Sequence, residues 1–261
     1  MTVKNLRTAK CYEIIEVKVS DSHPHAYKPH LHSQLSIGII ESGETILTID
    51  EVDCHFSKGD AVIIMPYVVH NCQPVDITNW AFTMIYLDDT YKDAFEKSLG
   101  KDLKIGVAKL GPQEFSLIKN LSRTLLSEHH AFSKEVEIID CLSTIIDSIE
   151  VKIEKTFDTH MDAIRDYINE YFLKELSLDD LEARFHVDKF KMIRSFKRLY
   201  NTTPSAYQLQ LKVDYAKQLM KTESDLASVA LASGFYDQAH FTREFKKTTG
   251  MTPKYYLTSI K

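Results

Sequence analysis

One segment near the C-terminal end of the chain occurs twice, and this repeat constrains the fold more than any other feature of the sequence. "DKFKMIRSFKRLYNTTPSAY", from Asp188 to Tyr207, aligns without a gap with "DQAHFTREFKKTTGMTPKYY", from Asp237 to Tyr256. Aspartate, arginine, phenylalanine, lysine, threonine, proline and tyrosine recur at the same offsets. The C-terminal part of the chain therefore contains one supersecondary unit twice.

Each copy has the pattern of two helices joined by a tight turn. The first helix is "SLDDLEARF" or "DLASVALAS", and the second begins at an N-capping aspartate, Asp188 or Asp237. The second copy has Gly234 in the turn, where a helix-turn-helix needs an unusual backbone angle, whereas the first copy has "FH" there. A long helix that starts at Pro204 is predicted to hold the two units in a fixed relation.

The second helix of each copy is predicted to bury apolar residues on one side and to expose a mixed face on the other. That face can read a major groove, because arginine can bind guanine, glutamine can bind adenine and apolar groups can contact thymine methyls. A merely solvated basic face is the alternative, and the duplication argues against it. The residues predicted to contact DNA are Lys189, Phe190, Ile193, Arg194, Lys197, Arg198, Gln238, Ala239, Thr242, Arg243, Lys246 and Lys247.

The stretch from about Ser177 to Tyr256, and above all "GFYDQAHFTREFKKTTGMTP", resembles the DNA-binding domain of AraC/XylS-type transcriptional regulators. The resemblance implies a domain with two helix-turn-helix units that binds double-stranded promoter DNA. RNA polymerase is a further candidate partner. The base-contacting positions that the resemblance implies are Phe190, Ile193 and Arg194 in one helix and Gln238, Ala239 and Arg243 in the other.

Charge and cysteine usage agree with a regulator of this kind. Residues 1–157 carry 16 Lys and Arg against 23 Asp and Glu, whereas residues 158–261 carry 16 against 14, a mildly basic balance. The chain begins without a signal-like apolar segment, and its longest apolar run, 61–65, is too short to span a membrane. The four scattered cysteines suit free thiols. We expect a cytoplasmic protein with no membrane partner.

Residues 10–90 alternate short β-rich runs such as "LSIGII" and "AVIIM" with turn signals, which predicts an all-β sandwich or barrel. The string "PHLHSQ" and the later His70 resemble the cupin barrel, in which His-x-His and a further His bind a metal with a carboxylate. Ser36 stands where that family has its metal-binding glutamate, which removes the anionic ligand. We expect an effector pocket lined by His30, His32, Gln34 and His70, and no cofactor. Zinc on the three histidines, or a purely structural role, is the alternative.

Between Pro112 and Phe157 the apolar period becomes helical, and a stripe runs from Val136 to Ile153. Core packing explains part of it, and the rest predicts a homodimer with an isologous contact. The expected domains are a cupin-like effector-sensing β-barrel at 1–110, a helical dimerisation segment at 111–157 and an all-α DNA-binding domain at 158–261. The expected function is effector-controlled transcription regulation without enzymatic activity. A metal-dependent cupin enzyme and a non-specific architectural DNA binder are the alternatives.

Overall fold

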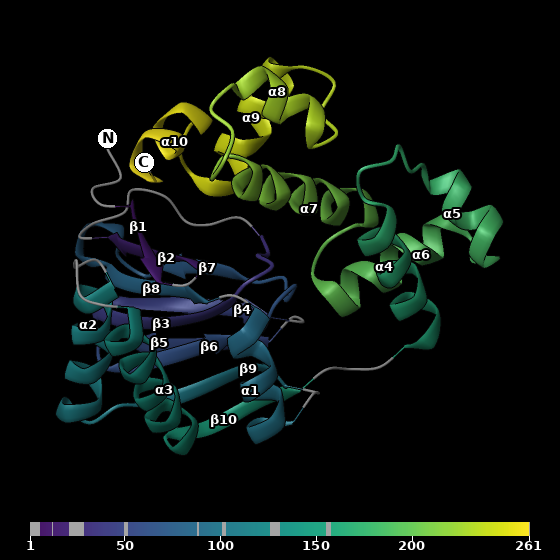
Figure 1. The fold of residues 1–261 in the computed structure, drawn as a ribbon. Coiled ribbons are helices and arrows are strands. Elements are labelled where there is room, and N and C mark those ends of the chain that lie inside the picture. Colours follow the sequence, from purple (N-terminus) through teal and green to yellow (C-terminus); the bar gives the residue numbers. More distant parts are fainter. Residues whose placement is uncertain are drawn as a thin grey trace.

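The structure is a computed structural model, and it describes residues 6–11, 13–20, 29–49, 52–87, 89–100, 103–125, 131–154 and 158–260. A β-rich half is followed by an all-helical half (Figure 1). Among the described residues, none of the helices combines the length and the apolar character that crossing a membrane requires.

The described strands form two sheets in which neighbouring strands run antiparallel. The larger has the order β1-β2-β8-β3-β6-β9-β10 and the smaller β5-β4-β7. The strands of the large sheet are β1 (Leu6–Cys11), β2 (Glu13–Ser20), β3 (Leu35–Ser42), β6 (Asp60–Ile64), β8 (Ala81–Leu87), β9 (Leu103–Lys109) and β10 (Ile149–Glu154). Those of the small sheet are β4 (Glu44–Ile49), β5 (Val52–Ser57) and β7 (Asn71–Pro74), and a short 3-10 helix spans Ile77–Asn79.

The strand β3 shows why the predicted β-rich runs fold together. Its residues Leu35 to Ile40 are all buried, as expected for a near-continuous apolar run that is covered on both faces. The predicted fold class is confirmed, although the described strands do not close into one barrel. Strands β1 and β10 form the two edges of the large sheet. The strands β4, β5 and β7 pair with one another in the small sheet and not with these edges.

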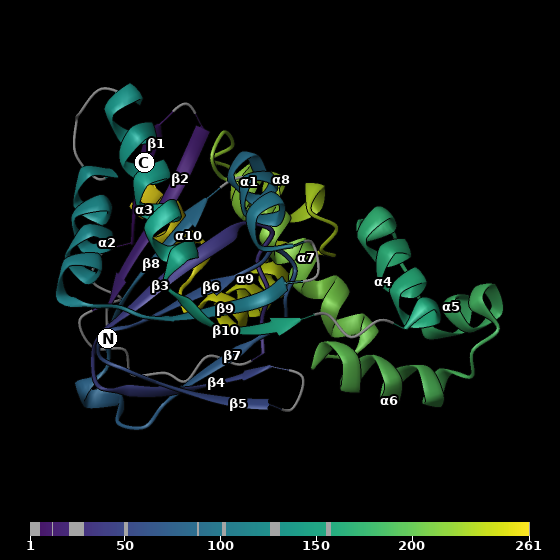
Figure 2. The same cartoon turned by 90° about the horizontal axis from the view of Figure 1, so that it is seen from below.

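Three helices pack with the sheets, namely α1 (Asp89–Leu99), α2 (Pro112–Leu125) and α3 (Ala131–Asp147). Figure 2 shows them at a different side of the large sheet from β4, β5 and β7. The α3 residues Ile138, Cys141, Leu142 and Ile145 belong to the same core as the strands. The segment predicted to mediate dimerisation therefore packs against its own β-rich half, and the domain boundaries at 110 and 157 stay predictions.

The prediction that the helical stripe continues to Ile153 is wrong. Helix α3 ends at Asp147, and Ile149 and Ile153 lie in β10, which pairs with β9. Residues four apart lie on one face of a strand as well as on one side of a helix, so their spacing alone does not separate the two. The alternation of Ile149, Val151 and Ile153 with charged residues is the strand period.

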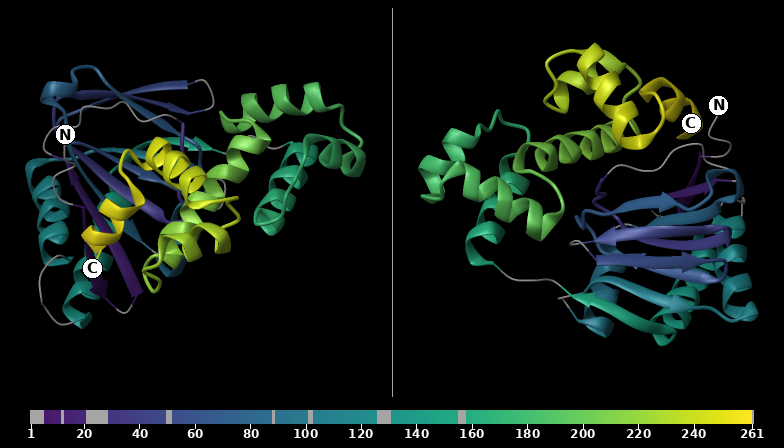
Figure 3. Two further views of the ribbon diagram at one scale, coloured as in Figure 1. Left: turned by 90° about the horizontal axis from the view of Figure 1, so that it is seen from above. Right: turned by 180° about the vertical axis from the view of Figure 1, so that it is seen from behind.

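Seven helices follow in the described chain, and α7 joins two groups of them (Figures 1 and 3). The first group has a core that contains Met192 and Phe196, and the second has a core that contains Phe241 and Phe245. The helices are α4 (Thr159–Tyr171), α5 (Leu178–Phe185), α6 (Lys189–Tyr200), α7 (Pro204–Leu219), α8 (Leu226–Ala232), α9 (Gln238–Thr249) and α10 (Pro253–Ile260).

The predicted helix starts are confirmed. The side chain of Ser177 accepts a bond from the backbone N–H of Asp180, which completes a capping box. The aspartates Asp188 and Asp237 cap α6 and α9. Each cap satisfies backbone N–H groups that the first turn of a helix leaves without a partner.

The two turns differ in length. The left-handed residue is His186 (φ 54°) in the first unit and Gly234 (φ 77°) in the second. His186 lies two positions before its capping aspartate and Gly234 three positions before, so the duplicated units have diverged at this turn.

We predict that Gly234→Ala lowers the free energy of unfolding by about 1–2 kcal/mol, because a side chain strains a left-handed residue. An added Cβ would also lie 3.1 Å from the carbonyl oxygen of Leu173. The matched change His186→Gly removes the same kind of strain and should raise the free energy of unfolding by up to about 1 kcal/mol. Chemical denaturation measures both, and a Gly234→Ala protein as stable as the original chain would contradict the assignment.

Candidate functional site

The second helices of the two repeats, α6 and α9, present the predicted DNA-contacting residues on their outer faces. Met192, Phe196, Leu199, Phe241 and Phe245 are buried as predicted. Of the twelve predicted contact residues, the half-buried ones are Lys189, Ile193 and Thr242. The exposed ones are Phe190, Arg194, Lys197, Arg198, Gln238, Ala239, Arg243, Lys246 and Lys247.

Carboxylates hold several of these cations. The Nζ atom of Lys189 lies 2.7 Å from an oxygen of Asp179 in α5. Glu244 is buried and accepts from Arg243 Nε at 3.3 Å and from Lys247 Nζ at 3.2 Å. The side chain of Arg243 is still 71% exposed, so this pair orients the guanidinium more than it stabilises the fold.

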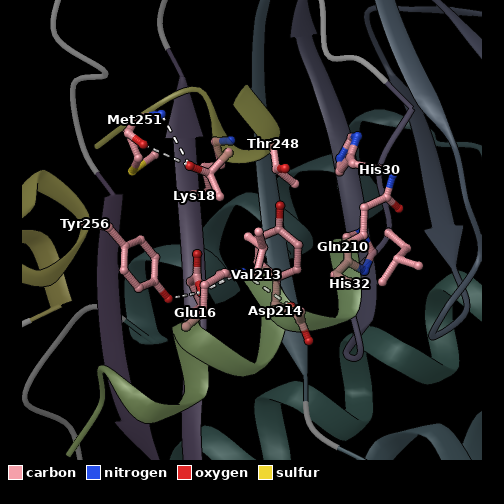
Figure 4. Close-up of a pocket in the computed structure, with 14 residues that line it drawn as sticks. Glu16, Lys18, His30, His32, Gln210, Val213, Asp214, Thr248, Met251 and Tyr256 are labelled. Carbon is pink, nitrogen blue, oxygen red and sulfur yellow. Dashed lines mark hydrogen bonds and ion pairs between the residues drawn. The ribbon is translucent and has the colours of Figure 1, made fainter. Parts of the chain in front are cut away.

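A second candidate site is a cleft between the large sheet and the helical half, with a volume of about 550 Å³ that includes its opening to solvent (Figure 4). Strands β2 and β8, the segment before β3, helices α7 and α10 and the end of α9 supply its walls. The lining residues are Glu16, Lys18, His30, Leu31, His32, Tyr86, Gln210, Val213, Asp214, Lys217, Thr248, Thr249, Met251 and Tyr256.

A buried polar network crosses this cleft. The hydroxyl of Tyr256 donates to Glu16 in β2 at 2.9 Å, and the ammonium of Lys217 lies 3.5 Å from Glu16 and 3.9 Å from Asp214. The backbone N–H of Ser33 donates to Asp214 at 3.2 Å. Burial alone would lower the pKa of Lys217, but the two carboxylates raise it, so this ammonium stays charged between the two halves.

Further contacts join the same two surfaces. The Gln210 amide donates to the carbonyl of Pro29 at 2.9 Å, and its own oxygen is buried without a hydrogen-bond partner in the described part of the chain. Leu31 and Val69, from the β-rich half, are buried in the core of the first helix-turn-helix unit. The two halves therefore share packed surface as well as polar contacts.

Lys18 is the second buried amine of the cleft. Desolvation lowers its pKa to about 8, although the charge of Glu16 opposes the shift. Lys18 follows Glu16 by two residues on β2, so both side chains lie on the face of the strand that meets the helical half. The cleft therefore contains a pair of acids and a pair of amines.

The three predicted histidines lie together, and two of them line the cleft. The ring centroid of His70 lies 4.4 Å from that of His30 and 5.0 Å from that of His32. The centroids of His30 and His32 are 6.2 Å apart. Burial lowers the pKa of His32 well below its usual value and that of His70 to about 4, so both imidazoles are neutral near pH 7. His30 and His32 line the cleft, whereas His70 and the equally buried Gln34 lie outside its lining.

The zinc alternative gains no support from this arrangement. Within the described ranges, no group of three or more His, Cys, Asp or Glu is placed to hold a metal ion. The Nδ1 atoms of His32 and His70 lie 3.0 and 2.9 Å from the backbone carbonyls of Gln34 and Val68. Ser36, at the glutamate position of a cupin, has its hydroxyl 3.0 Å from His32 Nδ1.

Sequence reasoning missed the residues that form the centre of the cleft, namely Glu16, Lys18, Asp214, Lys217 and Tyr256. Glu16 and Tyr256 lie 240 positions apart in the chain. One local signal was present, since Glu16 and Lys18 place two charges on one face of a strand that is otherwise apolar, in "IIEVKV". On the helical side, the structure buries several polar residues of α7, including Gln208, Gln210 and Asp214.

Comparison with known proteins gives matches to both halves. A family model described as an AraC-like ligand binding domain matches residues 15–133, and one described as a helix-turn-helix domain matches residues 181–259. The uncharacterized HTH-type transcriptional regulator YbfI of Bacillus subtilis is 23% identical over 222 residues, which cover 81% of this chain and 80% of that protein. The MmsAB operon regulatory protein of Pseudomonas aeruginosa is 30% identical over 102 residues, which cover 39% of this chain and 33% of that protein.

Among solved structures, ToxT of Vibrio cholerae with a bound unsaturated fatty acid has a TM-score of 0.64. It is 14% identical, and the match covers 98% of each chain, so the two proteins share a two-domain fold. The two family matches together span most of the sequence, in the order that the structure shows. The chain belongs to the AraC family of transcriptional regulators, with a ligand-binding domain followed by a helix-turn-helix DNA-binding domain.

Proposed function

We propose that this regulator reads a specific operator with α6 and α9 and senses a small-molecule effector in the cleft between its two halves. The observation that carries the proposal is that the cleft is lined from both halves. A ligand bound there touches the sheet and the DNA-binding helices at once. It can therefore favour one arrangement of the two halves over another, which an effector must do to change DNA affinity.

The exposed faces of α6 and α9 support the DNA-reading part of the proposal. Each face combines groups that hydrogen-bond or contact bases with lysines or arginines suited to phosphates. Helix α7 joins the two units and packs against α4 and α9, so the spacing between the reading helices is set by one rigid element. The operator should contain two short blocks about one helical turn apart.

The chemistry of the cleft supports the effector part. Lys18, Tyr86 and Gln210 bring an amine, an aromatic ring and a buried amide oxygen to one space. A few convergent polar groups in a concave site are typical of small-molecule pockets. The fatty acid bound to ToxT supports a small organic ligand for this two-domain fold. His30 and His32 would contact such a ligand directly, and Gln34 and His70 would support them from behind.

The remaining parts of the proposal concern partners and location. Val136 and Ile139 on α3 are 51% and 53% exposed, and these apolar side chains support a homodimer through that helix. We further propose that the protein acts in the cytoplasm at promoter DNA, where it would meet RNA polymerase. Nothing in this role requires an enzymatic step.

The experiment that tests the proposed function is selection of bound duplexes from a random DNA library with the full chain. We expect enrichment of two blocks about one helical turn apart, and an affinity for that duplex that falls steeply with salt, because phosphate contacts release counterions. Absence of enrichment at low salt, with and without candidate effectors, would sink the proposal of specific reading.

We predict that Arg243→Ala costs about 1–3 kcal/mol of binding free energy and relaxes preference at one base position, because a bidentate arginine discriminates guanine. The matched change Lys247→Ala, four residues further along the same helix, should weaken all duplexes similarly. Arg243 and Lys247 both contact Glu244, so a comparison of the two variants also controls for loss of that contact. Fluorescence anisotropy on specific and random duplexes measures both, and equal losses for Arg243→Ala would refute its assigned role.

We predict that Tyr256→Phe lowers the free energy of unfolding by about 1.5–3 kcal/mol, because a buried hydrogen bond to the Glu16 carboxylate is lost. The control is Tyr236→Phe, since Tyr236 is 88% exposed and its hydroxyl should not matter for stability. Denaturant titration followed by circular dichroism compares the two variants. A Tyr256→Phe protein as stable as Tyr236→Phe would mean that the network does not hold the halves together.

A further inference from the structure

The two reading helices carry different chemistry at equivalent positions. Counting from the capping aspartates Asp188 and Asp237, Phe190 corresponds to Ala239 and Ile193 to Thr242. The arginine and the lysine further along each helix are the same in both. The duplicated units thus share the positions of one arginine and one lysine, and they differ where Phe190 and Ile193 correspond to Ala239 and Thr242.

In the first unit the outer face carries two apolar side chains beside Arg194, namely Phe190 and Ile193. Phe190 is 66% exposed, whereas other aromatic residues of its unit lie in the core. Ile193, on the same face, is half-buried. The neighbouring cation, Lys189, is drawn back toward α5 by Asp179 at 2.7 Å. A large ring left in water on a reading helix gains free energy when a partner covers it.

The only apolar group that a base pair presents in the major groove is the C5-methyl of thymine. The surroundings of Phe190 suit duplex DNA rather than a protein partner, because the exposed cations Lys191, Lys197 and Arg198 lie on the same short helix. These cations would attract the phosphates that border a groove. Thymine methyls are therefore the groups that best match this face.

In the second unit the corresponding surface is small and polar. Gln238 and Ala239 are exposed at the first turn of α9, and the small side chain of Ala239 would let the backbone approach a groove closely. Glu244 accepts from Arg243 through Nε, so a guanine would be met by the terminal nitrogens of the same guanidinium. Glutamine and arginine bind adenine and guanine through paired hydrogen bonds.

We propose that the two helix-turn-helix units read DNA by different means. Helix α6 reads a thymine-containing block through apolar contact of Phe190 and Ile193 with C5-methyl groups, and α9 reads purines through hydrogen bonds from Gln238 and Arg243. The operator is therefore chemically asymmetric, despite the duplication of the unit. This inference rests on the proposed function, since it presupposes that both helices enter the major groove.

The test uses base analogues in the duplex enriched from the random library. Deoxyuridine in place of thymidine removes only the C5-methyl group, and we expect about a fourfold loss of affinity for each contacted thymine in the block read by α6. The same replacement in the other block should have no effect. There, 7-deazaguanine in place of guanine removes one of two acceptors and should weaken binding by about fivefold or more.

Variants assign each block to its helix. Phe190→Ala should weaken binding to the thymidine duplex and reduce its response to deoxyuridine, whereas Arg243→Ala should abolish the response to 7-deazaguanine only. The control is Leu231→Ala, because Leu231 is also 66% exposed but lies on α8, outside the reading helices. That variant should respond to both analogues like the original chain.

The outcomes separate the two levels of the proposal. Failure to enrich any duplex would overturn specific DNA reading and this inference with it. An enriched duplex whose affinity does not change with deoxyuridine, or a Phe190→Ala variant that responds to deoxyuridine as strongly as the original chain, would overturn the inference alone. Equal sensitivity of both blocks to deoxyuridine would overturn the asymmetry.

Discussion

A buried ammonium group can lie between two domains only if carboxylates surround it, and Lys217 of α7 meets this condition. Glu16 comes from the β-rich half and Asp214 from the helical half, and Tyr256 adds a hydrogen bond to Glu16. Removing one partner would leave a charge buried without compensation, which costs far more than the pair contributes. The position of the second helix-turn-helix unit against the sheet, and the cleft between them, depend on this network.

The same network connects the cleft to the helices of the DNA-binding domain. The helix that carries Lys217 and Asp214 also connects the two reading units. A ligand that competes for Lys18, Gln210 or the histidines would act beside α7, the helix that connects the two helix-turn-helix units. Effector binding and DNA reading are then linked through one element, and the coupling requires no long chain of contacts.

The two helix-turn-helix units share their capping and part of their core, whereas their exposed faces agree only in part. The capping aspartates and the buried Phe196 and Phe245 recur because each unit must cap a helix and fill a core. The turn differs by one residue, and Phe190 and Ala239 occupy equivalent positions on the reading faces. The residues that cap and fill the two units are therefore more alike than the residues at the centre of their exposed faces.

The sequence by itself determined the repeat, the capped starts of α6 and α9, their buried and exposed faces and the β-rich character of the front half. These features follow from local spacing, because capping and amphipathic periods involve residues a few positions apart. The stripe that ends in β10 was misread for the same reason, since Ile149 and Ile153 satisfy both periods. Only the tertiary structure decided that Glu16 meets Lys217 and Tyr256, and that His70 lies outside the cleft. Those contacts depend on how the β-rich half and the helical half pack, and no local period of the chain encodes that packing.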